Sequence, residues 1–214
     1  MGFMVQTFSN YVKTSSEYAN GWLTIFDIDD TLFRTTASIR VRNSITRETI
    51  RTLTTAEYAS YKLGANEMFD YTEFKDAAKF YKESQPIGRM MRRAKLILAS
   101  SKKYENSRVI ILTARTDFDS KNIFLKTFRK YGFDIDSVRV ERAGNIANET
   151  SGANRKAMIV RKYLNTKSFT KVRFFDDDRE NLKAFLRLSR EYPAITFEAY
   201  RVIEDGEIRV FRSI

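Results

Sequence analysis

The sequence predicts an α/β fold in which a mainly parallel sheet is covered by helices on both faces. Three observations lead to this prediction: apolar runs of strand length, polar residues at the point where these runs end, and helical segments between them. The runs are 22–26, 109–112 and 171–175. Strands that alternate with helices are typical of parallel sheets, whose ligands collect at the carboxyl ends of the strands.

The first predicted core strand, 22–26, has the continuous apolar character of a strand buried on both faces. It is preceded by residues 1–20, a possible short helix to which we assign no role. It is followed by a segment, 34–107, that interrupts the core pattern. We therefore predict a core made of 21–33 and 108–214, with 34–107 inserted after the first core strand.

The inserted segment 34–107 is expected to form a small flap followed by a mostly helical cap. Alternating apolar and polar residues predict a hairpin over 38–53. Apolar residues at helical spacing and capping signals then predict three helices. These helices are expected at 54–63, 69–81 and 90–100.

The core pattern resumes at Arg108 and alternates helices with strands to the end of the chain. The predicted elements after the strand at 109–112 are a helix at 120–131 closed by Gly132, a strand at 138–140, a loop at 143–152, a helix at 155–164, a strand at 171–176, a helix at 180–190, a strand at 196–200 and a hairpin over 200–211. The dipeptide Asp205-Gly206 is the expected turn of that hairpin.

Composition indicates one folded unit and excludes several chemistries. The chain has 214 residues, of which 43% are hydrophobic and only two are proline, unlike a disordered chain. It contains no cysteine and no histidine. These absences exclude disulfides, thiolate nucleophiles, His-ligated metals and catalytic triads that depend on histidine. Acid, base or nucleophilic chemistry must come from carboxylates, Lys, Tyr, Ser or Thr.

Charge and hydropathy bear on the partners of the chain. The net charge is +11, which creates a positive field that attracts phosphate-rich partners such as nucleic acid. A basic surface that serves only solubility explains the same charge. Four basic residues lie within the helix expected at 90–100 or directly before it. They indicate either contact with a polyanion or a helix face that is simply exposed to solvent. These residues are Arg89, Arg92, Arg93 and Lys95.

No apolar run is long enough for a transmembrane helix, so we expect no membrane partner. The first residues also lack the continuous apolar stretch of a signal peptide. We therefore expect a cytoplasmic protein. The sequence gives no indication of the oligomeric state.

The candidate site is centred on Asp27, Asp29, Asp30 and Thr31, which directly follow the first core strand. Carboxylates this close require compensation by a cation or by hydrogen-bond donors. Their oxygens are hard ligands that suit Mg²⁺. An Asp-rich turn that caps a helix is the alternative. Because Thr113 and the acids 176–178 follow other core strands and fall on the same sheet edge, we favour a metal-assisted site.

The order of these residues resembles the haloacid dehalogenase (HAD) superfamily of phosphatases. Its four motifs are matched in sequence order over about residues 23–188. They are Asp27-x-Asp29-x-Thr31, Thr113, Lys156 and Asp176-Asp177. The resemblance implies a Rossmann-like, HAD-like core with a small flap or cap insertion after the first core strand.

The resemblance also implies a role for each matched residue. Asp27 would be the nucleophile that forms an aspartyl-phosphate, and Asp29 the general acid and base. Thr113 and Lys156 would bind the phosphoryl oxygens. The implied Mg²⁺ ligands are the carboxylates of Asp27, Asp176 and Asp177 and the backbone carbonyl of Asp29.

The acidic triple 176–178 leaves two choices for the metal pair, Asp176 with Asp177 or Asp177 with Asp178. We favour the first, because Asn181 lies four residues after Asp177, as in relatives with paired acids. Asp178 is then expected to cap the next helix.

Two arginines lie next to the matched motifs. Arg115 either fixes its loop by pairing with an acid or contacts substrate. Arg34, together with the hairpin over 38–53, corresponds to the flap over the site in the family and is a candidate substrate contact.

The expected function is that of a Mg²⁺-dependent phosphomonoesterase with a phosphorylated substrate. A nucleotide or a polynucleotide 3′-phosphate end is the candidate substrate, because of the basic charge. The chain is also similar in size and layout to the 3′-phosphatase module of polynucleotide kinase phosphatases. The alternatives are a phosphatase of a small free metabolite, a phosphomutase and a non-catalytic nucleic-acid-binding protein with the same fold.

Overall fold

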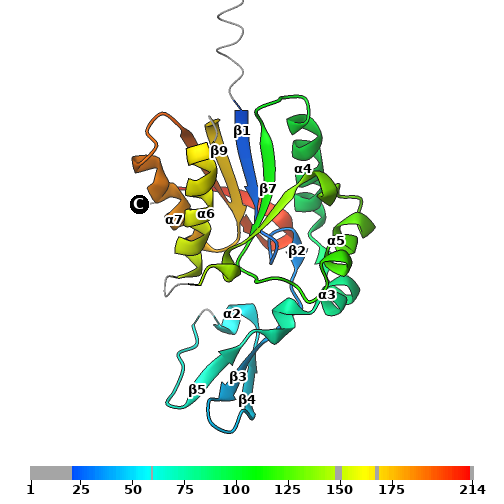
Figure 1. The fold of residues 1–214 in the computed structure, drawn as a ribbon, viewed down its shortest axis with the longest axis vertical. Helices are drawn as coiled ribbons and strands as arrows, with labels where there is room; N and C mark the ends of the chain where they lie inside the picture. The colour runs from blue at the N-terminus through cyan, green and yellow to red at the C-terminus, as the bar shows by residue number, and fades with distance from the viewer. Residues whose placement is uncertain (1–20, 59, 148–150, 167–168, 213–214) are drawn as a thin grey trace, which may run out of the picture.

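The computed structural model describes residues 21–58, 60–147, 151–166 and 169–212, so the short helix considered for 1–20 lies outside the described residues. A six-stranded central sheet has the order β11-β10-β9-β1-β7-β8 (Figure 1). Its strands are β1 Gly21–Phe26, β7 Arg108–Thr113, β8 Arg139–Arg142, β9 Phe169–Asp176, β10 Thr196–Ile203 and β11 Glu207–Phe211. All neighbouring strands are parallel except β10 and β11.

Register aligns the carboxyl ends of the two central strands. Phe26, the last residue of β1, pairs with Phe175 of β9, and the next residues are Asp27 and Asp176. Side chains alternate between the two faces of each strand. On β1, Leu23 and Ile25 therefore enter one core and Phe26 enters the other.

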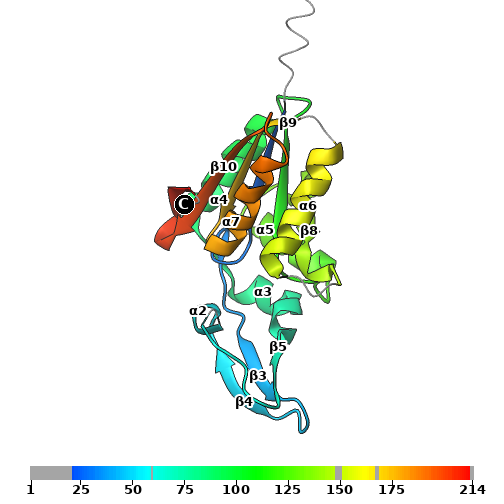
Figure 2. The same ribbon diagram turned by 90° about the vertical axis from the view of Figure 1, so that its left-hand side faces the viewer.

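Helices cover both faces of the central sheet, as the sequence predicted (Figures 1 and 2). One core contains buried residues of α3, α4 and α5, and the other contains buried residues of α6 and α7. The helices are α3 Ala77–Glu83, α4 Gly88–Ser101, α5 Lys121–Lys130, α6 Gly152–Thr166 and α7 Arg179–Arg187. Among the described residues, no helix has the length and apolar character needed to cross a bilayer.

Helix and hairpin ends follow the local signals in the sequence. Ser120 caps α5 by accepting a hydrogen bond from the backbone N–H of Ile123, and Gly132 follows the helix with φ of 68°. Asp178 caps α7, as expected. The predicted turn at Asp205-Gly206 joins β10 to β11, and both of its residues have positive φ.

The insertion differs from the prediction of a mostly helical cap. The expected hairpin is present as β3 and β4, but β5 pairs with β3 and completes a three-stranded antiparallel sheet that extends from the carboxyl end of the central sheet (Figure 1). The elements of the insertion are β2 Phe33–Arg34, β3 Ile39–Asn43, β4 Thr49–Leu53, α2 Thr55–Tyr58, β5 Glu67–Asp70, η1 Thr72–Lys75 and β6 Gln85–Pro86.

Aromatic packing explains why the two helices expected at 54–63 and 69–81 are wrong over much of their length. Phe69 pairs with Val41 across the sheet and contacts the rings of Tyr58 and Tyr61, at centroid distances of 4.8 and 6.2 Å. These cross-strand contacts favour the extended chain at 67–70 over the helix that local spacing predicted. Among the described residues of the expected first helix, only four form α2.

The third expected helix forms as α4 but does not belong to the cap. Its residues Met90, Met91, Ala94 and Leu98 are buried in the core that covers the central sheet. Ala77 and Phe80 of α3 join the same core. The assignment of the whole segment 34–107 to a flap and cap is therefore wrong for its last third, because helical spacing identifies a buried face but not its partner.

Glu73 fastens the three-stranded sheet to α3. Its carboxylate accepts hydrogen bonds from the backbone and hydroxyl of Ser38, at 3.1 and 2.9 Å, from Arg40 at 2.8 Å and from Lys79 at 2.7 Å. Burial raises the pKa of Glu73, but the bonds from Lys79 and Ser38 outweigh it and lower the pKa to about 2. The ionised form of this carboxylate is therefore stabilised by donors from the three-stranded sheet and its approach at Ser38 and from α3.

Replacing Glu73 by Gln should lower the free energy of unfolding at about pH 7 by about 1 to 2 kcal/mol, because charge-assisted hydrogen bonds are lost. The folded-state pKa of about 2 lies below the ordinary value of 4.5, so this stabilisation is present above 4.5 and declines as pH falls toward 2. Urea unfolding of both proteins at about pH 7 and about pH 3 measures the difference, which should shrink at the lower pH.

Glu83→Gln is the matched control, because Glu83 is more exposed and lies 3.8 Å from the same Lys79. It should change stability by less than about 0.5 kcal/mol. Equal losses in the two variants, or a Glu73 effect that is independent of pH, would contradict the role assigned to Glu73.

Candidate active site

The site begins with two aspartates at the carboxyl ends of neighbouring strands. Asp27 follows β1, and its backbone N–H donates to the carbonyl of Phe175 at 3.0 Å. Asp176 is the last residue of β9. Both side chains are almost completely buried, with exposed fractions of 6% and 0%. The sheet therefore holds two carboxylates side by side in an environment poor in water.

Lys156 of α6 lies between these carboxylates. Its Nζ donates to Oδ1 of Asp27 at 2.6 Å and to Oδ2 of Asp176 at 2.8 Å, and its side chain is 2% exposed. Asn181 of α7 donates from Nδ2 to both oxygens of Asp176 at 3.0 Å. The backbone N–H of Asp178 also donates to Asp176, at 2.9 Å. Asp176 is thus fixed from three directions.

Asp177 adds a third carboxylate to the site. Oxygens from Asp27, Asp176 and Asp177 lie within 4.8 Å of one another. Asp178, in contrast, is turned away and accepts from the backbone N–H of Glu180 at 2.8 Å. The structure therefore brings together the first of the two acid pairs considered from the sequence.

Burial and mutual repulsion act against ionisation of this cluster. Burial raises the pKa of Asp27 and of Asp176, and attraction to Lys156 only partly opposes it. Burial and the charge of Asp176 raise the pKa of Asp177 to about 8. Burial lowers the pKa of Lys156, but Asp176 and Asp27 outweigh this effect, so the pKa is raised and the ammonium is retained.

The donor set fits Mg²⁺. All three clustered side chains offer carboxylate oxygens, the hard ligands that Mg²⁺ prefers. One ammonium, that of Lys156, does not balance three carboxylates. A divalent cation would supply the missing charge and favour ionisation of Asp177.

Asp29 has a separate environment. Arg115 donates to it through two nitrogens, Nε to Oδ2 at 2.9 Å and Nη2 to Oδ1 at 2.6 Å. The hydroxyl of Thr35 donates to Oδ1 as well. Burial raises the pKa of Asp29, but Arg115 and Thr35 outweigh it and hold the pKa below its ordinary range. Of the two interpretations of Arg115, the structure shows the pairing with an acid.

Arg115 is itself held between the core and the insertion. Its Nη1 donates to the carbonyl of Phe74 at 2.8 Å, and the guanidinium lies over the rings of Phe74, Phe80 and Phe118 at 4.7 to 5.2 Å. Gly144 packs behind it, where a Cβ would lie 2.6 Å from the carbonyl carbon of Arg115. A side chain at Gly144 would therefore displace the arginine that holds Asp29.

The remaining residues of the first motif shape the turn. Asp30 has φ of 52° and accepts from the backbone N–H of Thr35 and the hydroxyl of Thr55, both at 3.2 Å. Asp30 therefore stabilises the turn. Thr31 is fully buried, and its hydroxyl has no hydrogen-bond partner within the described parts of the chain. Thr31 therefore fills space in the turn.

Thr113 and Arg34 lie in different surroundings. Thr113 ends β7 and is buried, and its Oγ1 accepts from the backbone N–H of Arg115 at 3.1 Å. Its hydroxyl proton thus remains available for another acceptor. Arg34 forms an exposed ion pair with Asp205 at 2.5 Å. It is tied to the turn between β10 and β11 and does not join the carboxylate cluster.

Sequence patterns did not identify Thr35, Phe74 or Arg201 as parts of the site. Thr35 and Phe74 hold Asp29 and Arg115, and Arg201 donates to the backbone carbonyl of Asp177 at 3.1 Å. Thr35 stands beside the equally polar Thr36, and Phe74 acts through its carbonyl and ring. Neither the residue type nor the spacing marks these contacts in advance.

Comparison with known proteins gives a likeness of structure only. No family model matches this sequence, and no curated protein matches it. Among solved structures, the chain is similar to the HAD domain of effector protein Lem4 from Legionella pneumophila, with a TM-score of 0.50 and 9% sequence identity. The match covers 88% of this chain and 92% of that domain. This chain has a HAD-like fold.

The HAD-like fold agrees with the architecture expected from the motifs, a mainly parallel central sheet with helices on both faces. At 9% identity the likeness concerns the fold and does not extend to activity. The chemical interpretation therefore rests on the side chains gathered at the end of β1 and β9.

Proposed function

We propose that this protein is a phosphoric monoester hydrolase that works through an aspartyl-phosphate on Asp27. The observation that carries the proposal is the buried ammonium of Lys156, which joins Asp27 to Asp176 beside Asp177. The HAD-like fold and the order of the four motifs support it. This arrangement concentrates cationic and carboxylate groups where a phosphoryl group would meet the sheet edge.

Asp27 provides the nucleophile. Lys156 bonds Oδ1, which leaves Oδ2 as the attacking atom. In the first step Oδ2 forms a bond to phosphorus, the ester P–O bond breaks, and the leaving oxygen receives a proton. In the second step water attacks the same phosphorus, the aspartyl P–O bond breaks, and inorganic phosphate leaves with the carboxylate of Asp27 restored.

Asp29 donates the proton in the first step and accepts one from water in the second. Asp29 lies two residues after Asp27, and its charge helps to raise the pKa of Asp27, so the two carboxylates are close enough to serve one phosphoryl group. The structure shows Asp29 in its pair with Arg115, which favours the ionised form. Acid catalysis therefore requires Asp29 to exchange Arg115 for the leaving-group oxygen when substrate binds.

Mg²⁺ is the proposed cofactor. The carboxylates of Asp27, Asp176 and Asp177 would hold it, with the backbone carbonyl of Asp29 as a further ligand. When bound, the ion supplies positive charge to the phosphoryl oxygens in the transition state. Lys156 supplies charge as well, and the hydroxyl of Thr113 donates a hydrogen bond to a phosphoryl oxygen.

The proposed substrate class is a nucleotide or a polynucleotide with a 3′-phosphate end. Support comes from the net charge of +11, which raises the local concentration of polyanions. A small phosphorylated metabolite and a phosphomutase reaction are the competing candidates. A phosphomutase leaves the phosphate on the organic product, whereas a hydrolase releases it.

Replacing Asp27 by Asn should abolish hydrolysis of a generic aryl phosphate in the presence of Mg²⁺. We expect phosphate release to fall by about 10³-fold or more, because the attacking oxygen is lost. Asp136→Asn removes an exposed carboxylate that pairs with Arg129 and should leave the rate unchanged. Phosphate release is measured for both variants and the wild type, beside a panel of metabolites and of 3′- and 5′-phosphorylated oligonucleotides.

Two results would contradict the proposal. One is equal inactivity of wild type and Asp27→Asn across the whole panel, which would favour a non-catalytic protein. The other is retention of phosphate on the organic product, which would favour a phosphomutase.

Mg²⁺ should raise the thermal unfolding midpoint of the wild type, because it binds the folded carboxylate cluster. An excess of about 100-fold over Kd gives about 2.7 kcal/mol, and each kcal/mol corresponds to about 2 to 4 °C for a chain of this size. Asp177→Asn should lose most of this response. Thermal unfolding with and without Mg²⁺ measures it.

Asp178→Asn is the matched control, because Asn also caps helices well and Asp178 caps α7. It should keep the wild-type response to Mg²⁺. If Asp178→Asn loses the response and Asp177→Asn keeps it, the metal pair is assigned to the wrong residues.

A further inference from the structure

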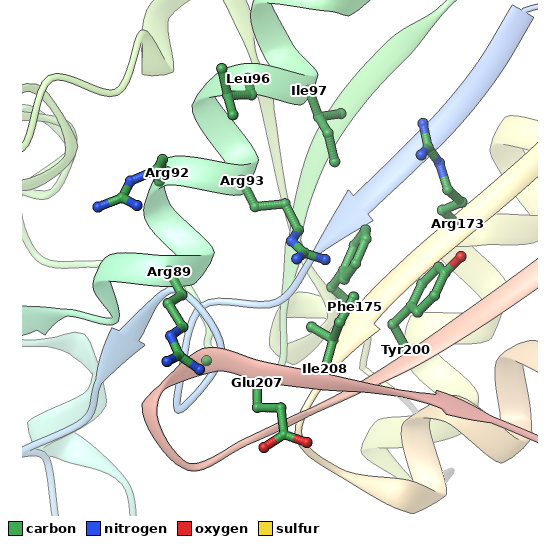
Figure 3. A pocket seen from close by; sticks show the side chains of 11 residues that line it. Arg89, Arg92, Arg93, Leu96, Ile97, Arg173, Phe175, Tyr200, Glu207 and Ile208 are labelled. Carbon is green, nitrogen blue, oxygen red and sulfur yellow. The ribbon is translucent and has the colours of Figure 1, made fainter.

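One face of the central sheet is left open between α4 and the β10–β11 hairpin. A cavity of about 650 Å³ lies there (Figure 3). Its lining includes four arginines, namely Arg89, Arg92, Arg93 and Arg173, and the rings of Phe175 and Tyr200. We call this cavity the arginine groove. Its volume falls within the range of sites that bind organic ligands.

Strand alternation and helix placement create the arginine groove. Phe174 and Ala199 face the core under α6 and α7, so Phe175 and Tyr200 face the opposite side. The buried face of α4 reaches only part of this side. Gly206 seats the hairpin against α4, because a Cβ there would lie 2.7 Å from Cγ2 of Ile87.

The arginines of α4 lack acidic partners. Arg89 and Arg92 are exposed and Arg93 is half-buried, and none of them forms an ion pair with a described residue. Figure 3 shows Arg89 and Arg93 directed from α4 toward the hairpin and the sheet. The acid in the lining is Glu207, which lies 3.4 Å from Arg209. The groove therefore has an excess of positive charge.

Arg173 adds a cation from the floor of the groove. Its guanidinium lies over the ring of Trp22 at 4.7 Å, and its buried Nε has no hydrogen-bond partner within the described residues. Leu23 of β1 packs in the core under α6 and α7, so the preceding residue, Trp22, faces the opposite, open side of the sheet. Trp22 is 43% exposed there. The positive charge thus continues along the sheet from α4.

Flat rings accompany these cations. The rings of Phe26, Phe175 and Tyr200 stack across three neighbouring strands, with centroid distances of 4.9 and 4.8 Å and interplanar angles of 12°. Phe26 and Phe175 are buried, at 0% and 2% exposed, so the ring of this stack that is accessible from the groove is that of the half-buried Tyr200. Trp22 presents another ring on the same face. A ligand with both phosphates and planar rings would match the two kinds of side chain in this groove.

We infer that the arginine groove binds single-stranded nucleic acid, with Arg89, Arg92 and Arg93 contacting phosphates and unpaired bases packing against the accessible rings of Tyr200 and Trp22. Basic grooves with aromatic side chains are the usual sites for single strands, whose bases are free to make such contacts. A duplex hides its bases, and an acidic peptide or an anionic lipid surface has none. Of these ligands, single strands are therefore the ones that can contact both the arginines and the aromatic rings.

This binding is separate from the proposed hydrolysis. The groove contains none of the carboxylates of the candidate active site, and its ligand needs no phosphomonoester. Unphosphorylated oligonucleotides in the absence of Mg²⁺ therefore test the groove alone. Failure of the hydrolase proposal would leave this result unchanged.

The test measures fluorescence anisotropy of labelled single-stranded DNA and RNA of about 12 nucleotides, within the usual site sizes. Arg89→Gln combined with Arg93→Gln should weaken binding by about 10-fold or more. The logarithm of affinity should also depend less steeply on the logarithm of salt concentration, by about 0.7 for each phosphate that the protein no longer neutralises. Thermal unfolding confirms that the variant is folded.

Lys162→Gln combined with Arg190→Gln is the matched control. Both residues are exposed, and they lie on α6 and just after α7, on the opposite face of the sheet. This variant carries the same net charge as the groove variant. It should change affinity by less than about 3-fold, because only the distant field is altered.

Matched ligands test the contribution of the bases. An abasic strand of the same length and charge, a duplex, an oligoglutamate peptide and vesicles with anionic lipid should each bind at least about 10-fold more weakly than the single strand. The inference is overturned if single strands do not bind, if the groove variant and its control weaken binding equally, or if any of these ligands binds as tightly as the single strand.

Discussion

The buried ammonium of Lys156 is the interaction on which the candidate active site depends. It lies 2.6 Å from Asp27 and 2.8 Å from Asp176, two carboxylates that burial alone would neutralise. Without this cation the two carboxylates would either take up protons or repel each other in an environment poor in water. Burying these charges costs free energy. A catalytic role would explain this cost, because charges that are already in place need little rearrangement during a reaction.

Much of the core could be predicted from the sequence, because its signals are local. Apolar runs that end in acids identified β1 and β9, and Asp178 was expected as a helix cap and is one. The cap could not be predicted in the same way. Phe69 fits a helical pattern, but its pairing with Val41 of β3, together with its ring contacts to Tyr58 and Tyr61, favours β5. Likewise, the pairing of Asp29 with Arg115 joins residues 86 positions apart.

The two proposed sites share one strand but use different sides of it. Along β9, Phe175 faces the arginine groove, and the next residue, Asp176, meets Lys156 at the strand end. Arg34 binds Asp205 in the turn that borders the groove, so the insertion is connected to that hairpin as well. A single strand bound in the groove would thus lie on the same sheet that presents Asp27.

The proposed hydrolysis requires that Asp27 becomes phosphorylated during turnover. This step is tested by acid quenching of a sample of the protein incubated with Mg²⁺ and an aryl phosphate, followed by mass spectrometry of the peptide that contains residues 22–33. We expect a phosphoryl group on Asp27 that alkali removes, because acyl phosphates are labile in alkali. Phosphate released at the normal rate with no phosphorylated Asp27, or with the phosphoryl group on another residue, would contradict it.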